Sequence, residues 1–184
     1  MRILAISGSL RRDSHNTMLL RAARELLGPG DTLELWEGLR EMPPYDQDDD
    51  VEPAPAAVAG LRAAVASADA VLIATPEYNH SIPGSLKNAL DWASRPFAAN
   101  AFRGKPVAVV GSSTGLFGAV WAQAEVRKVL TAMGARVADV EIAVGQAAEK
   151  FDADGRLVDD TVREQLADAV ATLTAATEPE LIAA

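Results

Sequence analysis

The stretch Ala70-Val71-Leu72-Ile73-Ala74-Thr75-Pro76 decides the fold class of this 184-residue chain. Its unbroken apolar run is typical of a strand that is buried on both faces, and the proline that follows stops the strand. Strands of this kind occur in parallel sheets that are covered by helices on both sides. Further strands are expected at Ile3–Ile6, Asp31–Glu37, Pro106–Val110 and Ala135–Val144.

Segments with apolar residues at helical spacing separate these strands. They are expected at Thr17–Leu27, Ala54–Ala66, Ser85–Ser94, Val120–Met133 and Thr161–Ala175. Alternating strands and helices with short connections are the pattern of parallel βαβ units joined by right-handed crossovers. The length is near the usual one of about 150 residues for a domain, so we expect a single domain over residues 1–184. The tail from Thr177 on is expected to fray.

The composition excludes several classes of protein. The chain has no cysteine, which excludes disulfides, thiolate zinc sites and the cysteine nucleophile of a phosphatase of similar size. Its 17 basic and 26 acidic side chains give a net charge of −9, which argues against non-specific nucleic-acid binding. No apolar run approaches the roughly 20 residues that span a bilayer, and the N-terminus lacks the apolar segment of a signal peptide. We therefore expect a cytoplasmic protein that binds neither nucleic acid nor membranes.

The one long irregular stretch, Gly38–Pro55, contains the acidic residues Asp46, Asp48, Asp49 and Asp50. Charge runs usually belong to the solvated surface, so a solvated loop is the plain interpretation of these side chains. Aspartates also ligate hard cations, but this run lacks the glycine and the terminal glutamate of a calcium loop.

In an open parallel sheet, ligands bind beyond the carboxyl ends of the strands, where the strand order reverses. After the first strand comes Ser7-Gly8-Ser9-Leu10-Arg11-Arg12-Asp13-Ser14-His15-Asn16-Thr17, which leads into a helix. A glycine, hydroxyls, an arginine and the free N–H groups of a helix start suit a phosphate. The same residues are also compatible with ordinary helix capping and a solvated cation. Their spacing matches neither a dinucleotide fingerprint nor a P-loop.

After the third strand comes Thr75-Pro76-Glu77-Tyr78-Asn79-His80-Ser81-Ile82-Pro83-Gly84-Ser85-Leu86-Lys87-Asn88-Ala89-Leu90-Asp91-Trp92. Two prolines stiffen this loop, and Tyr78 and His80 add flat surfaces, so its backbone is suited to contact the edge of a heterocycle. Alternatively, Tyr78 covers the sheet edge and His80 is an ordinary surface histidine. Lys87 and Asp91 are spaced to form a simple i,i+4 pair.

After the fourth strand comes Gly111-Ser112-Ser113-Thr114-Gly115-Leu116-Phe117-Gly118-Ala119. Its glycines let the backbone approach a flat ring closely, although a flexible turn before a helix is the alternative. Each loop alone is ambiguous. Three ligand-suited loops at one edge of a sheet together predict a ligand site.

Three motifs stand in a fixed order along the chain. They are Gly8-Ser9-Leu10-Arg11 with Ser14 and Asn16, then Pro76-Glu77-Tyr78-Asn79-His80-Ser81-Ile82-Pro83-Gly84, then Leu86-Lys87-Asn88-Ala89-Leu90-Asp91-Trp92. In this order and spacing they closely resemble the NADPH-dependent FMN reductase family, which includes quinone, chromate and azo-dye reductases. The resemblance implies a flavodoxin-like α/β fold, with a doubly wound five-stranded parallel sheet of order 2-1-3-4-5 and helices on both faces.

The resemblance also implies site residues, cofactors and an assembly. The FMN phosphate would be held by Ser9, Arg11, Ser14 and Asn16. The ribityl chain and the isoalloxazine ring would be lined by Pro76, Glu77, Tyr78, Asn79 and His80, and Ser113 would contact the ring from another side. NADPH or NADH is the implied hydride donor, and a homodimer or homotetramer is the implied assembly.

These features together predict an FMN-dependent oxidoreductase with ping-pong turnover. A reduced nicotinamide would give a hydride to flavin N5 and leave, and a quinone-like, azo, nitro or chromate acceptor, or FMN as a dissociating substrate, would follow. We expect no dedicated catalytic side chain and no metal, because the flavin carries the chemistry. Arg11 and Arg12 make this end of an acidic protein positive, which suits an anionic nucleotide. The alternatives are a flavodoxin-type electron carrier and a flavin-binding protein without turnover.

Overall fold

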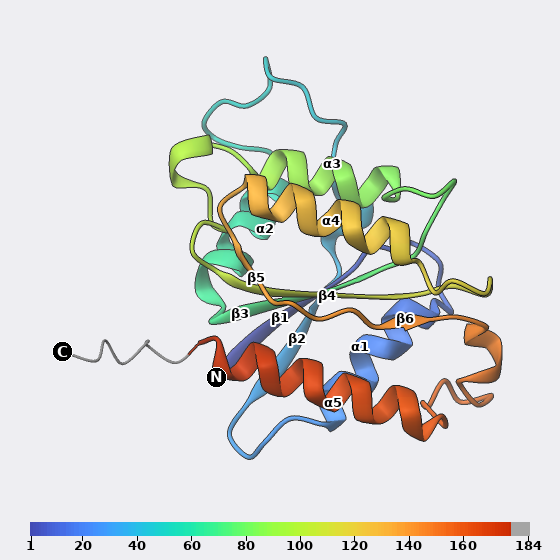
Figure 1. Cartoon of the computed structure of the whole chain (residues 1–184). Helices are drawn as coiled ribbons and strands as arrows, with labels where there is room; N and C mark the ends of the chain where they lie inside the picture. Colours follow the sequence, from blue (N-terminus) through green and yellow to red (C-terminus); the bar gives the residue numbers. More distant parts are fainter. Residues whose placement is uncertain (178–184) are drawn as a thin grey trace.

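The computed structural model describes residues 1–177, which form a twisted sheet between two layers of helices (Figure 1). Within these residues the sheet has six strands, all paired in parallel: β1 (Arg2–Ser7), β2 (Thr32–Trp36), β3 (Ala70–Thr75), β4 (Pro106–Ser112), β5 (Arg136–Val137) and β6 (Ala143–Val144). Their order is β2-β1-β3-β4-β5, and the short β6 also pairs with β4. The expected strand order 2-1-3-4-5 is therefore confirmed.

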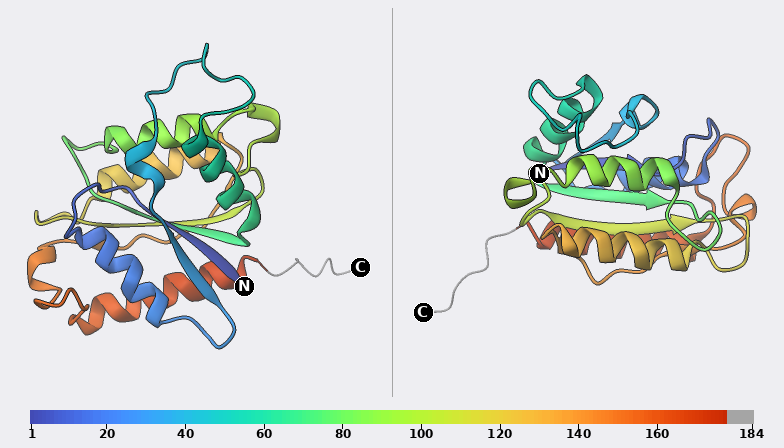
Figure 2. Two further views of the ribbon diagram at one scale, coloured as in Figure 1. Left: turned by 180° about the vertical axis from the view of Figure 1, so that it is seen from behind. Right: turned by 90° about the horizontal axis from the view of Figure 1, so that it is seen from above.

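Helices cover both faces of the sheet, as the sequence predicts. In the described part of the chain the α-helices are α1 (His15–Glu25), α2 (Ala56–Ser67), α3 (Gly84–Ala93), α4 (Val120–Ala132) and α5 (Asp160–Ala175). α1 and α5 pack on one face, and α2, α3 and α4 pack on the other (Figure 2). Short 3-10 segments lie in the connections at η1 (Gly38–Glu41), η2 (Phe97–Ala99) and η3 (Ala147–Glu149).

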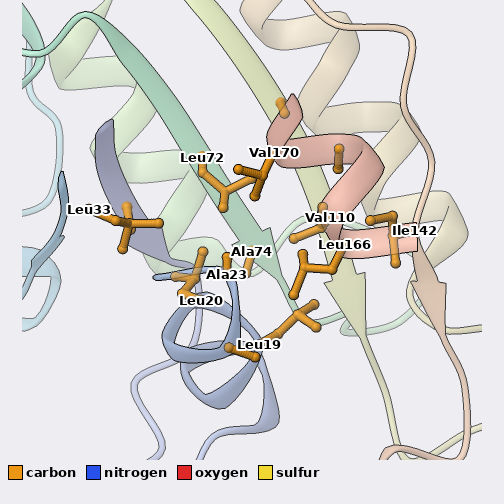
Figure 3. Packing of buried hydrophobic residues seen from close by; sticks show 14 of the residues in the cluster. Leu19, Leu20, Ala23, Leu33, Leu72, Ala74, Val110, Ile142, Leu166 and Val170 are labelled. Carbon is orange, nitrogen blue, oxygen red and sulfur yellow. The ribbon is translucent and has the colours of Figure 1, made fainter. Parts of the chain in front are cut away.

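β3 lies at the centre of the core, and all of its residues are buried. Leu72 and Ala74 belong to the cluster that includes α1 and α5, whereas Val71 and Ile73 belong to the cluster that includes α2, α3 and α4. Figure 3 shows Leu72 and Ala74 among apolar side chains of α1 and α5. Burying one Leu, Ile or Val side chain is worth about 1.5–3 kcal/mol, so Val71, Leu72 and Ile73 of β3 together contribute several kcal/mol to the packing free energy.

The predicted fifth strand, Ala135–Val144, is wrong in one respect, because it is divided into β5 and β6. The backbone leaves the ladder after Ala138, whose N–H donates to the Val107 carbonyl (2.8 Å). The Val140 N–H then donates back to the Ala138 carbonyl (2.9 Å), which is a three-residue turn. The Arg127 guanidinium binds the Val140 carbonyl (3.0 Å) and so stabilises this turn. At the edge of a sheet, such a departure costs few ladder bonds.

The acidic stretch between η1 and α2 is part of a long connection that projects at the top of Figure 1. Asp46, Asp48 and Asp49 are exposed, and Asp50 pairs with Arg62 (2.9 Å). The solvated interpretation of this stretch is therefore confirmed.

The predicted pair of Lys87 and Asp91 is formed, with 2.7 Å between the ammonium and the carboxylate. At the end of α5, the Thr177 hydroxyl donates to the Thr174 carbonyl (2.7 Å). Residues 178–184, which make up the rest of the tail that is expected to fray, lie outside the described residues. No α-helix of residues 1–177 combines the length and the apolar character needed to span a bilayer.

Two glycines let the loop after β4 lie directly against β6. Gly118 has a φ of +57°, and a Cβ at this position would lie 2.2 Å from the carbonyl carbon of Ala143. A Cβ at Gly145 would lie 2.1 Å from the carbonyl oxygen of Leu116. Contacts this short are impossible, so any side chain at either position would push the loop away from the sheet.

We therefore expect Gly118→Ala to destabilise the fold, because it adds both a backbone clash and a strained φ. Overpacking of this kind costs about 1–3 kcal/mol, which corresponds to a fall of roughly 3–10 °C in Tm for a chain of this size. Thermal unfolding followed by circular dichroism measures the change. Gly60→Ala is the matched control, because Gly60 lies inside α2 with nothing within 4 Å of its added Cβ. This control should gain about 0.5–1 kcal/mol, and equal Tm values for the two variants would contradict the prediction.

Candidate functional site

The loops that follow β1, β3 and β4 meet at the carboxyl edge of the sheet, at the right end of the molecule in the right-hand view of Figure 2. They border an open cavity of about 240 Å³. It is lined by Ser9, Arg11, Ser14, His15, Asn16, Pro76, Glu77, Tyr78, Ser112, Ser113 and Thr114. The three loops therefore come together as the sequence predicts.

The N-terminus of α1 lies at this cavity. The first intrahelical bond runs from the Met18 N–H to the Ser14 carbonyl (3.0 Å), so the N–H groups of residues 15–17 have no acceptor within the helix. Ser14 is buried and precedes the helix in an extended conformation, but its side chain makes no capping hydrogen bond. Free N–H groups at the positive end of a helix dipole form an anion site. This arrangement favours phosphate binding over ordinary capping.

Arg11 is held beside this helix start by local hydrogen bonds. Ser9 Oγ accepts from the Arg11 N–H (3.3 Å), and the Arg11 guanidinium donates to the Asp13 carbonyl. His15 stacks on Phe151, with 5.6 Å between the ring centroids. Burial lowers the pKa of His15, and the nearby charge of Arg11 lowers it further. At neutral pH, His15 is therefore an uncharged hydrogen-bonding group at the cavity.

Asn16 uses its side chain to hold α1 to the end of β4. Its Nδ2 donates to the Ser112 carbonyl (3.0 Å), and the Ser112 N–H donates to Asn16 Oδ1 (2.9 Å). Asn16 Oδ1 and one of the two Nδ2 hydrogens are therefore engaged, and the main-chain N–H of Asn16 has no acceptor within the helix. The Ser112 hydroxyl, in contrast, is buried at the cavity and has no hydrogen-bond partner among residues 1–177.

Glu77 lines the cavity, but its carboxylate serves α4. One oxygen accepts from the N–H groups of Trp121 (3.0 Å) and Ala122 (3.1 Å), in the first turn of that helix. The other oxygen lies 3.6 Å from His80 Nδ1. A carboxylate at a helix N-terminus is stabilised by the helix dipole. Glu77 therefore fixes the loop after β3 against the helix that follows β4.

A tight turn places Asn79 and His80 outside the cavity. Tyr78 and Ser81 exchange two backbone hydrogen bonds (3.1 and 3.2 Å), and the two residues between them have φ values of +54° and +59°. This is the geometry of a two-residue type I′ turn. His80 is exposed and packs edge-on against Trp121, with 4.6 Å between the ring centroids. Tyr78 stays at the cavity and is about half exposed (53%).

All of the predicted site residues except Asn79 and His80 line the cavity. Ser113 is among them, and its hydroxyl accepts from the Gly115 N–H (3.1 Å). The prediction did not include His15, Ser112 and Thr114, which also line it. These residues are neighbours of predicted ones in the sequence. Which residues of a loop line the cavity depends on the path of its backbone, and this path is known only from the structure.

A model of the family described as NADPH-dependent FMN reductase matches residues 1–149. The chain belongs to this family. Among its relatives is an NAD(P)H-dependent FMN reductase of Pseudomonas aeruginosa, 43% identical over 165 residues that make up 89% of this chain and 88% of the relative. A 2-hydroxy-1,4-benzoquinone reductase of a Burkholderia species is 38% identical over 167 residues, which cover 90% of each chain.

Solved structures agree with this assignment. The flavoenzyme NAD(P)H:(acceptor) oxidoreductase FerB of Paracoccus denitrificans matches the reductase with a TM-score of 0.85 at 35% identity, over 96% of each chain. A flavodoxin of Pseudomonas aeruginosa matches with a TM-score of 0.59 at 17% identity, over 95% of the reductase and 99% of that chain, and this shows the fold alone. The flavodoxin-like fold is therefore confirmed. The protein is an NAD(P)H-dependent oxidoreductase that uses FMN.

The residues at the cavity fit FMN. A phosphate needs donors, and the free N–H groups of residues 15–17 and the Arg11 guanidinium supply them at one end. The unpartnered Ser112 hydroxyl offers a further polar contact inside the cavity. Pro76, Tyr78 and the main chain around Ser113 border the rest of the space and suit a flat ring.

We expect Asn16→Ala to lower both stability and FMN affinity, because it leaves the buried Ser112 N–H and carbonyl without their partners. Each unsatisfied group costs about 1–3 kcal/mol, so Tm should fall by several degrees, and the loops after β1 and β4 lose their link. Thermal unfolding and FMN titration measure the two effects.

Asn88→Ala is the matched control. Asn88 also bridges two backbone groups, accepting from the Tyr45 N–H (2.7 Å) and donating to the Pro43 carbonyl (2.8 Å), but it does not line the cavity. This variant should lose stability and keep its FMN affinity. Equal FMN affinities for the two variants would show that the Asn16 amide does not organise the site.

A second prediction concerns His15, whose pKa is lowered in the protein without FMN. A bound phosphate dianion beside the ring favours the imidazolium form, so the pKa of His15 should rise when FMN binds. By linkage, FMN should then bind more tightly as the pH falls through this pKa. The chain has two histidines, so a proton NMR titration with His80→Gln for assignment reads His15 directly. A pKa that does not change with FMN would place the phosphate away from His15.

Proposed function

We propose that the reductase passes electrons from NADPH or NADH to quinone-type small molecules at the cavity between the three loops. The observation that carries this proposal is the pairing of an uncapped α1 N-terminus with an open, ring-sized space beside Tyr78 and Ser113. Several relatives are named as quinone reductases, including one from Pseudomonas putida that is 39% identical over 160 residues. Their names support a quinone-type acceptor here.

In this proposal, the chain binds FMN mainly through its main chain. The phosphate is held by Ser9, Arg11, Ser14 and the N–H groups of residues 15–17, and the ring is bordered by Pro76, Tyr78 and Ser113. Bound FMN supplies the redox chemistry, because it accepts a hydride from a reduced nicotinamide and returns the electrons to an acceptor. The side chains of the site orient the reactants and need not exchange protons with them. We retain the prediction that no dedicated catalytic residue is present.

The open side of the cavity explains why one place can serve two substrates in turn. Tyr78 and Thr114 are exposed at its border, so a flat acceptor can approach without moving the sheet. A short distance between reacting atoms, about 3–3.5 Å, is the main contribution that the protein must make. Because such an open border binds its ligands weakly and with little selectivity, the proposal also includes azo, nitro and chromate acceptors.

We also propose that the reductase works as a homodimer or homotetramer. Leu116, Phe117 and Trp121 are large apolar side chains that are exposed next to the cavity, and such patches are frequent at protein interfaces. Light scattering of the purified protein tests the assembly. The cytoplasmic location and the single domain over residues 1–184 also stay predictions.

The decisive experiment is an absorbance spectrum of the purified protein, followed by anaerobic addition of NADPH or NADH. We expect a flavin spectrum that bleaches with at least one nucleotide and recovers when a small quinone is added. A protein that bleaches but needs a partner protein for turnover would instead be a carrier. A yellow protein that never bleaches would be a flavin-binding protein without turnover, and one that stays colourless in excess FMN would overturn the proposal.

A variant of Arg11 tests the phosphate end of the site. Arg11→Ala should weaken FMN binding by about 10- to 100-fold, because a charge-assisted hydrogen bond to phosphate is worth about 1.5–3 kcal/mol. Arg103→Ala is the control, since it removes the same charge near the start of β4, at the opposite edge of the sheet. Fluorescence titration with FMN measures both. If Arg11→Ala binds FMN as tightly as the control does, Arg11 does not belong to the site.

A further inference from the structure

A second hollow, of about 230 Å³, adjoins the FMN cavity on the other side of the loop after β1. It lies between this loop, α1 and the segment that runs from the end of β2 into η1. Ser9 and Arg11 line both spaces, so the two are direct neighbours. Apart from Ser9, Arg11 and Thr17, the residues that line the second hollow have no part in the proposed FMN site.

Four arginines line this hollow: Arg11, Arg12, Arg21 and Arg40. The only carboxylate among its lining residues is that of Glu37. The chain as a whole has a net charge of −9, so this concentration of positive charge runs against the overall balance. Like charges held close together repel one another, and a bound polyanion removes that repulsion.

No carboxylate is paired with these arginines in the described chain. Among residues 1–177, none of the four forms an ion pair, whereas Arg62 and Arg127 pair with Asp50 (2.9 Å) and Glu141 (2.8 Å). The Arg40 guanidinium donates to the Leu10 carbonyl (2.7 Å), which fixes it beside the hollow. Arg12 and Arg21 donate no side-chain hydrogen bond to any group of the described chain, so their donors are available to a ligand.

An aromatic ring completes the hollow. Trp36, the last residue of β2, lines it together with Leu35 and Leu39; Leu35 and Trp36 are partly buried, and Leu39 is buried. The ring lies against the backbone of Gly38, where an added Cβ would come within 2.7 Å of Trp36 Cζ2. It therefore offers a flat surface that packs against this turn of the backbone. Indole rings and guanidinium groups both stack on nucleobases, and guanidinium groups also bind phosphates in bidentate fashion. The combination suits a nucleotide that carries a phosphate.

We propose that this hollow binds the adenosine 2′-phosphate end of NADPH, through Arg12, Arg21 and Arg40, and so makes the reductase prefer NADPH to NADH. The inference rests on the proposed function, because it assigns the donor nucleotide of that same reaction. The FMN phosphate occupies the anion site at the α1 N-terminus, so the additional positive charge is available for a different phosphate. A guanidinium cluster distinguishes the two nucleotides because only NADPH presents a dianion there.

The test measures binding as well as turnover on the FMN-loaded, full-length protein. The binding probes are adenosine 2′,5′-bisphosphate and adenosine 5′-monophosphate, titrated by calorimetry. We expect the bisphosphate to bind at least about tenfold more tightly than the monophosphate, and the double variant R12A/R21A to abolish most of this difference. The ratio of kcat/KM for NADPH to that for NADH should fall by at least about tenfold in the same variant.

The double variant R103A/R136A is the matched control, because it removes the same charge at the opposite edge of the sheet. If both double variants lower the NADPH rate alike, the effect is general steering and the inference is wrong. Equal affinities of the wild type for the two adenosine probes would also overturn it. Unchanged FMN retention and Tm show that R12A/R21A is folded.

The outcomes separate this inference from the proposed function. A wild type that oxidises both nucleotides, with a ratio that the arginine variant does not change, overturns only the inference. A wild type that oxidises neither nucleotide overturns the proposed function. In that case the difference in affinity between the two adenosine probes still decides whether the hollow binds a 2′-phosphate.

Discussion

Burial of β3 on both faces is the constraint on which the rest of the structure depends. Because β3 pairs with β1 and β4 in parallel, the chain must return along the sheet through helices that cover one face or the other. All the strands then end at the same edge. This common direction brings Asn16 and Ser112 into contact although they are 96 residues apart in the sequence.

At that edge, side chains and main-chain groups have different roles. The polar side chains of Asn16 and Glu77 are engaged by backbone groups of neighbouring elements, so they hold the loops in place. The main-chain N–H groups at the start of α1 are left free to meet an anion. Such a site needs no movement to bind a phosphate, since its dipoles are already oriented. A flavoprotein benefits from this rigidity, because the reacting atoms must be held within a narrow range of distances.

The charge at this edge of the sheet differs from that of the molecule as a whole. Its acidic side chains give the chain a net negative charge, and several of them pair with arginines away from the site. The arginines around the loop after β1 lack such partners within the described chain. A local positive region in a negative protein attracts anionic nucleotides to one place and repels them elsewhere. Arg11 lines both the proposed cofactor site and the proposed nucleotide site, so the two sites are neighbours.

The apolar runs by themselves determined the parallel sheet, since residues such as Val71 and Leu72 can be accommodated only between two helix layers. The motifs around Arg11 and Tyr78 likewise determined the family and most of the residues at the cavity. Only the tertiary structure decided that the fifth strand is divided, that the Asn16 amide is engaged, and that His80 turns outward. It also decided that Arg12, Arg21 and Arg40 surround one hollow. The physical reason is that strand and helix periodicities are local properties of the chain, whereas the direction of a loop side chain depends on hydrogen bonds to segments distant in sequence.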